Sequence, residues 1–254
     1  MKLIITGSCG HIGSYIADRM HLIPKIKETI LIDNLGSNRH YSLFNLKKKN
    51  KLIFHQIDIS KKNSLDKFKN VNYLIHCASM TNAEKSFSVK NEMFKNNLDC
   101  MRVVIDFCKK NKIKLIHLSS TSVYGKQAKI VDENCEKKYL KPQSPYAKIK
   151  LIEEKMLKKE KNLKYTTFRF GTISGFSKGI RFHTAVNKFC FNAALNQKIH
   201  VYKTALHQYR PYLTLSDAFK VYRYFEKFNL FKTFYFTILL ALRSVMKKIN
   251  IYLR

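Results

Sequence analysis

The residues best suited to acid–base chemistry are Tyr146 and Lys150, which stand four positions apart in the segment Pro145–Lys150 (PYAKIK). On a helix, two residues at this spacing share a face, one turn apart. A nearby ammonium stabilises a phenolate and lowers the pKa of the tyrosine. Tyr146 could then remove the proton of a substrate hydroxyl while a hydride leaves the same carbon. The simpler alternative is the solvated start of a helix, because this spacing arises easily in a Lys-rich chain.

A hydroxyl-rich segment, Leu118–Gly125 (LSSTSVYG), precedes this pair and directly follows an apolar run. In a doubly wound sheet, ligand chemistry occurs at the carboxyl ends of strands. Ser120 could therefore hydrogen-bond the reacting oxygen beside Tyr146. Serine-rich loops are usually only turns, so the segment carries weight only together with Tyr146 and Lys150.

A glycine-rich segment at the start of the chain is typical of a phosphate-binding turn. Thr6–Gly13 reads TGSCGHIG, with a strand-like run before it and a helical pattern after it. Gly7 permits a tight turn, Gly10 lets the backbone approach a pyrophosphate, and Gly13 lets the helix pack close to the strand. The N-terminus of that helix offers free N–H groups and a positive dipole to phosphates.

Asp33 lies 20 residues beyond Gly13, at the end of the second predicted strand. A carboxylate there accepts both ribose hydroxyls of a dinucleotide and repels a 2′-phosphate. We therefore expect NAD(H) rather than NADP(H). Arg39 follows soon after and could soften this preference.

Alternating elements must position these residues. Short apolar runs predict strands and longer periodic segments predict helices, which is the pattern of βαβ units in a parallel sheet. The fold class is therefore α/β, a doubly wound parallel sheet of the Rossmann type. The predicted strands are Lys2–Thr6, Thr29–Asp33, Leu52–Ile57, Tyr73–Cys77, Lys114–Leu118 and Tyr165–Phe170, and the predicted helices are Ile12–Leu22, Met93–Lys110, Tyr146–Lys161 and Ser216–Phe228.

Three regions are expected along the chain. Residues 1–170 form the dinucleotide-binding domain with the catalytic residues, and residues 171–231 form a small, incomplete substrate-binding part. Residues 232–254 form a divergent basic and apolar tail. Its apolar run Phe234–Leu242 is too short to span a membrane, so it predicts an interfacial helix or a buried segment.

Composition limits the partners. Lys+Arg 48 against Asp+Glu 17 gives the 254-residue chain a net charge of +31, which raises nucleic acid or a membrane surface as a partner. The lysines are scattered, however, without an arginine-rich arm or a zinc-finger spacing, so an acidic small-molecule substrate fits better. The six cysteines show no metal-ligand spacing, which predicts free thiols and no metal. Because Met1 leads directly into a strand, we expect no signal peptide and a cytoplasmic location.

Taken together, these motifs resemble the extended short-chain dehydrogenase/reductase superfamily, in its NAD-dependent nucleotide-sugar epimerase/dehydratase family, with similarity to UDP-glucose 4-epimerases. The resemblance runs in family order over residues 1–217. The matching segments are TGSCGHIG, Asp33, QIDIS with Asp58, HCAS at 76–79, Asn97, LSSTSVYG, PYAKIK, FRFGTISG and RPYLTLSD.

The resemblance implies a role for each matching position. The implied catalytic residues are Ser120, Tyr146 and Lys150. The implied NAD-binding residues are Gly7, Cys9, Gly10, His11, Ile12, Gly13, Asp33, Asn34, Asp58, Ile59, Cys77, Ala78, Ser79 and Asn97, with Tyr146 and Lys150. The implied substrate-binding residues, for a sugar nucleotide that is most simply a UDP-sugar, are Ser120, Tyr146, Thr172, Arg181 and Arg210. The segment Arg169–Gly175 is expected to lead into the substrate pocket.

The chain departs from the family in two places. Dehydratases of the family carry an acid pair just after the catalytic hydroxyl, but Thr121 and Ser122 stand there, which disfavours dehydration. After about Phe231 the family pattern stops, so the substrate lid looks truncated, by a divergent end or a shifted reading frame.

The leading interpretation is an NAD-dependent nucleotide-sugar epimerase that acts through a transient keto sugar. The alternatives are a nucleotide-sugar dehydrogenase or reductase with net redox, a catalytically inactive NAD-binding paralogue, and a nucleic-acid-binding protein. The resemblance also implies a possible homodimer through the helices predicted at Met93–Lys110 and Tyr146–Lys161.

Overall fold

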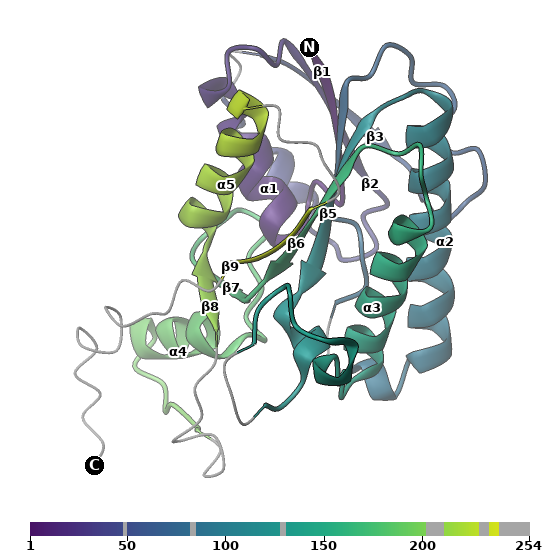
Figure 1. The fold of residues 1–254 in the computed structure, drawn as a ribbon. Coiled ribbons are helices and arrows are strands. Elements are labelled where there is room, and N and C mark those ends of the chain that lie inside the picture. The colour runs from purple at the N-terminus through teal and green to yellow at the C-terminus, as the bar shows by residue number, and fades with distance from the viewer. Residues whose placement is uncertain (48–49, 82–84, 128–130, 202–210, 229–233, 239–254) are drawn as a thin grey trace.

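The structure, a computed structural model, describes residues 1–47, 50–81, 85–127, 131–201, 211–228 and 234–238 (Figure 1). The strands are β1 (Lys2–Thr6), β2 (Glu28–Asp33), β3 (Lys51–Gln56), β4 (Tyr73–His76), β5 (Lys114–Ser120), β6 (Tyr165–Phe170), β7 (Thr172–Ser174), β8 (Tyr212–Thr214) and β9 (Phe234–Ile238). The α-helices are α1 (His11–Arg19), α2 (Lys90–Lys110), α3 (Pro145–Lys158), α4 (Ala185–Ala194) and α5 (Leu215–Phe228).

Within the described residues, seven strands form one parallel sheet in the order β3-β2-β1-β4-β5-β6-β9. The chain begins in the middle of the sheet, runs outward through β2 to β3, and then crosses back to β4 on the other side of β1. This reversal is the switch point of a doubly wound sheet, and ligands bind there outside the carboxyl ends of the strands. The predicted Rossmann fold and the six predicted strands are confirmed.

Helices cover both faces of the sheet, with α1 and α5 on one face and α2 and α3 on the other (Figure 1). Alternate residues of β1 serve the two faces, because successive side chains of a strand point in opposite directions. Leu3 and Ile5 belong to the core cluster that α1 and α5 close, whereas Ile4 belongs to the cluster under α2 and α3. Burial on both faces explains why the strands are continuous apolar runs.

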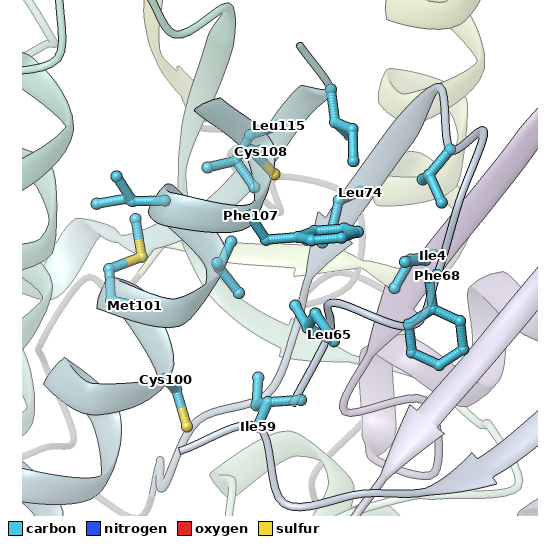
Figure 2. Close-up of a cluster of buried hydrophobic side chains, with 14 of the residues drawn as sticks. Ile4, Ile59, Leu65, Phe68, Leu74, Cys100, Met101, Phe107, Cys108 and Leu115 are labelled. Carbon is cyan, nitrogen blue, oxygen red and sulfur yellow. The ribbon is translucent and has the colours of Figure 1, made fainter. Parts of the chain in front are cut away.

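The second cluster shows how α2 is held on the sheet (Figure 2). Phe107 points from the helix toward Leu74 on the sheet, and Cys100, Met101 and Cys108 belong to the same buried cluster. Burial raises the pKa of the Cys100 thiol to about 12, so this thiol packs as a small neutral group. Cys100 and Phe107 are buried in this core, so a homodimer through α2 would need contacts from other residues of the helix. The homodimer stays a prediction.

The predicted substrate-binding part is built from small elements. β7 pairs with β8 in a second sheet of two parallel strands, and α4 lies between them in the sequence. Arg210 falls in residues 202–210, which lie outside the described residues.

Of the two alternatives predicted for the apolar run of the tail, the interfacial helix is wrong. Phe234–Ile238 does not form an interfacial helix but adds β9 to the main sheet, in parallel register with Thr166–Phe170 of β6. β-branched and aromatic residues in FYFTI suit a strand, and the short apolar run is equally compatible with a helix by periodicity alone. The remaining residues of the apolar run, 239–242, lie outside the described residues, as does Phe231.

Two statements hold for the part of the chain that the structure describes. None of its helices has the length and apolar character that a bilayer crossing requires. No group of three or more His, Cys, Asp or Glu side chains is placed there to hold a metal ion. All six cysteines are free thiols.

Candidate active site

The glycine-rich turn after β1 is tight because Gly7 adopts a left-handed backbone conformation, with φ of +65°. A Cβ atom on Gly7 would lie 2.6 Å from the amide nitrogen of Ala78. The amide of Cys77 donates to the carbonyl oxygen of Thr6 at 3.0 Å. The ends of β1 and β4 therefore meet so closely that only glycine fits between them.

Helix α1 begins directly on this turn. A Cβ atom on Gly13 would lie 2.2 Å from the carbonyl oxygen of Gly7, so the helix sits against the turn as the sequence predicts. Gly10 is the N-cap of α1 and has no side chain to satisfy the first-turn N–H groups. These groups remain available to an anion such as a pyrophosphate.

The side chains of His11 and Ile12 serve packing. His11 Nε2 lies 2.8 Å from the carbonyl oxygen of Gly175, and Ile12 packs against the core under α1 and α5. Burial lowers the pKa of His11 to about 4, so its ring is neutral at physiological pH and donates to that carbonyl. If these two residues contact the cofactor, their backbone groups must do so. The contacts stay a prediction.

Asp33 is fixed beside the turn. Its two carboxylate oxygens accept one hydrogen bond each, from the amide of Cys9 at 3.0 Å and from the amide of Leu35 at 2.9 Å. An ionised carboxylate can accept about four hydrogen bonds, so capacity for two ribose hydroxyls remains. Asn34 is exposed, and its side chain accepts from the amide of Gly36. Together with the turn, Asp33 fits the adenosine half of NAD.

The residues after β3 are engaged locally. Asp58 Oδ1 accepts from the amide of Ser60 at 3.0 Å and from its hydroxyl at 2.7 Å. Ile59 is buried in the cluster under α2. The adenine contact predicted for Asp58 stays a prediction.

The segment after β4 is held by α2. Asn97 is buried, accepts from the amide of Met80 at 2.8 Å and donates to its carbonyl at 3.0 Å. The Ser79 hydroxyl donates to the same carbonyl. Asn97 thus holds the backbone of the segment after β4. Both the oxygen and the nitrogen of its side-chain amide are engaged with Met80.

Ser120 is the last residue of β5, so the sheet places it at the carboxyl edge. Its hydroxyl accepts from the amide of Ser122 at 3.2 Å and from the hydroxyl of Ser122 at 2.9 Å. These bonds form the short 3-10 turn Thr121–Tyr124, against which α3 packs. The structure therefore brings the serine loop to the helix that carries Tyr146 and Lys150.

Helix α3 starts where the sequence predicts, because Ser144 caps its first turn and Pro145 occupies the first helical position. Tyr146 is half-buried, whereas Lys150 is only 3% exposed. The Lys150 ammonium lies 5.8 Å from the centre of the Tyr146 ring. The predicted sharing of one helix face is confirmed, and the cation lies close enough to act on the phenol.

Two glutamates of α3 belong to the site although the sequence reading passed over them. Glu153 Oε2 lies 2.8 Å from Lys150 Nζ and 2.9 Å from His117 Nε2. The next residue, Glu154, accepts a hydrogen bond from the Ser119 hydroxyl. The only sequence signal was their spacing from Lys150, because a helix this rich in Lys and Glu otherwise looks solvated.

The side chain of Arg169 serves the interior, and the prediction that the segment Arg169–Gly175 leads into a substrate pocket stays a prediction. The residue is buried in β6, where it donates to Glu154 and to the hydroxyl of Tyr124. Desolvation disfavours a lone buried charge, and the pairing with Glu154 explains why this arginine tolerates the interior.

The predicted substrate residues of the small part are placed differently from one another. Thr172 is exposed at the start of β7. Arg181 is half-buried and donates to the hydroxyl of Thr81. Its loop is tied to α1, because the Ser177 hydroxyl donates to the carbonyl of His11 at 2.8 Å. Arg181 therefore contacts the segment that follows β4.

This combination defines the class of the protein: a Rossmann fold with a glycine-rich turn suited to a dinucleotide, and with the predicted catalytic residues Ser120, Tyr146 and Lys150 at the carboxyl ends of the strands. Residues 3–227 match the NAD dependent epimerase/dehydratase family. The chain belongs to this family, and its cofactor is NAD.

Two curated relatives illustrate the range of activities. A UDP-glucose 4-epimerase of Schizosaccharomyces pombe is 28% identical over 169 residues, which cover 62% of this chain and 46% of the relative. A dTDP-D-glucose 4,6-dehydratase of Dictyostelium discoideum is 27% identical over 61% of this chain and 39% of the relative. The chain spans about half the length of the curated relatives it matches.

Solved structures confirm the fold. A UDP-N-acetylglucosamine 4-epimerase from Methanobrevibacter ruminantium, in complex with UDP-N-acetylmuramic acid, superposes with a TM-score of 0.81 at 25% identity, covering 94% of this chain and 76% of that one. A UDP-glucuronic acid 4-epimerase from Bacillus cereus, solved with NAD and a fluorinated sugar nucleotide, gives a TM-score of 0.83 at 20% identity, covering 94% and 77%.

Proposed function

We propose that this chain is an NAD-dependent nucleotide-sugar epimerase. The observation that carries the proposal is the placement of Tyr146 and a buried Lys150 on one face of α3, packed against the turn that begins at Ser120. The three side chains would supply a base, a cation and a hydroxyl at the carboxyl ends of the strands, where dinucleotides bind in this fold.

The glycine-rich turn and Asp33 would hold NAD⁺, which would supply a reversible hydride acceptor for the sugar carbon, with no net change in the cofactor. Tyr146 removes the proton of the hydroxyl on that carbon and gives it back in the reverse step. The charge of Lys150 favours the phenolate form of Tyr146. Ser120 donates its hydroxyl proton to the same substrate oxygen.

The residues after Ser120 favour epimerisation over dehydration. Elimination of water from a keto sugar needs an acid and a base close to the reacting carbons. Thr121 and Ser122 occupy the positions in question, and neither hydroxyl ionises near neutral pH. The keto sugar would then turn over and be reduced on its other face.

The substrate is proposed to be a UDP-sugar, held in part by its diphosphate. Arg181 is the best-placed candidate for this anion, because it contacts the segment that follows β4 and a guanidinium fork suits phosphate oxygens. The positive charge of the whole chain would also speed capture of such a substrate.

The test is incubation of the purified chain with NAD⁺ and a panel of UDP-, GDP- and dTDP-sugars, with products separated by chromatography. An inverted sugar without accumulation of NADH supports the proposal. Accumulating NADH would instead identify a dehydrogenase. Tight NAD binding without turnover in any sample would identify an inactive paralogue. Tyr146→Phe is the matched control, because it keeps the ring and removes the proton acceptor.

A further inference from the structure

The carboxylate of Glu153 lies at the centre of a buried polar group of side chains behind the catalytic face of α3. One oxygen, Oε2, lies 2.8 Å from Lys150 Nζ and 2.9 Å from His117 Nε2. Glu153 is 1% exposed, Lys150 3% and His117 0%. The ion pair is therefore almost completely shielded from water.

Three further titratable groups lie around this pair. The Arg181 guanidinium acts on Cys77 and Tyr146, whereas His76 and Cys77 are neutral. His76, on β4, shares a hydrogen bond with the hydroxyl of Thr6 at 2.8 Å, and burial lowers the pKa of His76 to about 3. Burial raises the pKa of the neighbouring Cys77 to about 12. Within the described part of the chain, Glu153 is thus the ionised acid that directly contacts Lys150.

A buried lysine cannot hold its proton alone. Desolvation by itself pushes the pKa of a fully buried ammonium down by up to several units. For Lys150 burial acts in this direction, but the carboxylate of Glu153 and the phenol of Tyr146 outweigh it, and the pKa of Lys150 ends above its ordinary value. Without the carboxylate of Glu153, burial would lower the pKa of Lys150, and Tyr146 would offset only part of that effect.

We propose that Glu153 is a positioning residue that keeps Lys150 charged and fixed beside Tyr146. The proposal rests on the proposed role of Tyr146 as the base. Glu153 contacts the Lys150 ammonium at 2.8 Å and acts through it. His117 orients the carboxylate from β5.

Glu153→Gln tests this, because the amide keeps the shape and removes the charge. In the NAD-loaded protein, Lys150 should become neutral near pH 7, and Tyr146 should ionise at higher pH, by roughly one pH unit or more. Phenolate absorbance measures this shift as the difference between each protein and its Tyr146→Phe partner. The acidic limb of the turnover profile, on which activity rises as the base ionises, should move to higher pH with it. An unchanged or lower midpoint would overturn the proposal.

A double substitution separates charge from structure. An arginine at position 150 keeps its proton without a carboxylate partner. Adding Glu153→Gln to Lys150→Arg should therefore leave the Tyr146 midpoint where Lys150→Arg alone puts it. An equal upward shift in both backgrounds would show that Glu153 acts by some route other than the lysine proton.

Further variants guard against misfolding. Glu153→Asp keeps the charge but retracts it from Lys150, so a smaller upward shift is expected even if Glu153→Gln does not fold, and no shift would overturn the proposal. Glu160→Gln, which removes a partly exposed carboxylate near the end of the same helix, should change nothing. Because the absorbance titration needs no turnover, an inactive chain would disprove the proposed function and still leave the role of Glu153 decided.

Discussion

Arg169 forms a bidentate ion pair with Glu154 in the interior of the protein. Arg169 Nε lies 2.9 Å from Glu154 Oε1, and Arg169 Nη2 lies 2.6 Å from Glu154 Oε2. The pair joins β6 to α3. Glu154 also accepts a hydrogen bond from the hydroxyl of Ser119, the residue directly before Ser120. The buried pair thus fixes the helix of Tyr146 against the strand of Ser120.

Removing one member of this pair should be costly. Arg169→Met leaves Glu154 buried without its counter-ion, and the free energy of unfolding should fall by about 3–5 kcal/mol. Urea unfolding followed by circular dichroism measures the change. The double variant Arg169→Met/Glu154→Leu removes both charges and should recover much of the loss. A double variant less stable than the single one would contradict this account.

Gly13→Ala should destabilise the start of α1 and impair NAD binding together. The added methyl would lie 2.2 Å from the carbonyl oxygen of Gly7, and relief requires a shift of the backbone, at a cost of about 1–3 kcal/mol. Thermal unfolding and calorimetric titration with NAD⁺ measure the two effects. Gly10→Ala is the control for stability, since its methyl would meet the same oxygen at 3.3 Å. Equal stability of the two variants would refute the packing argument.

Asp33→Asn should weaken NAD binding and relax the preference over NADP. An amide has one oxygen and no charge, so it cannot accept from both Cys9 and Leu35 and no longer repels a 2′-phosphate. We expect a loss of NAD affinity of roughly tenfold, equivalent to about 1.4 kcal/mol. Parallel titrations with NAD⁺ and NADP⁺ report the ratio. Asn34→Ala, at the exposed neighbour, should leave that ratio unchanged.

Acidification should destabilise the fold before any carboxylate is protonated. Burial lowers the pKa of His11 to about 4 and that of His76 to about 3, whereas both would titrate near 6.5 in the unfolded chain. Between these values the unfolded state binds more protons, so stability falls as the pH drops below about 6.5, by up to roughly 2.7 kcal/mol per pH unit for two groups.

Urea unfolding at a series of pH values from 7.5 to 5 measures this slope. His76→Gln removes one of the two groups and keeps a hydrogen-bonding partner for Thr6, so it should reduce the slope by about half. A wild-type stability that stays constant down to pH 5 would rule out the neutral buried histidines.

Local signals were enough for the sheet and for part of the site. The central strands are apolar on both faces, so their composition marks them, and the glycine turn and the Tyr146–Lys150 spacing are local patterns. The interior roles of Glu153 and Arg169 could not be predicted because they depend on partners from other elements, His117 on β5 for the first and Glu154 on α3 for the second. The strand at Phe234–Ile238 was missed because only its pairing with β6 distinguishes it from a short helix.

The Lys150–Glu153 pair lies almost entirely out of contact with solvent, while the net charge of +31 is carried mainly by scattered lysines. Dissolved ions shorten the reach of exposed charges but hardly affect enclosed ones. Raising the ionic strength would therefore slow the arrival of the proposed sugar-nucleotide substrate and leave the proposed proton transfer at Tyr146 as it was.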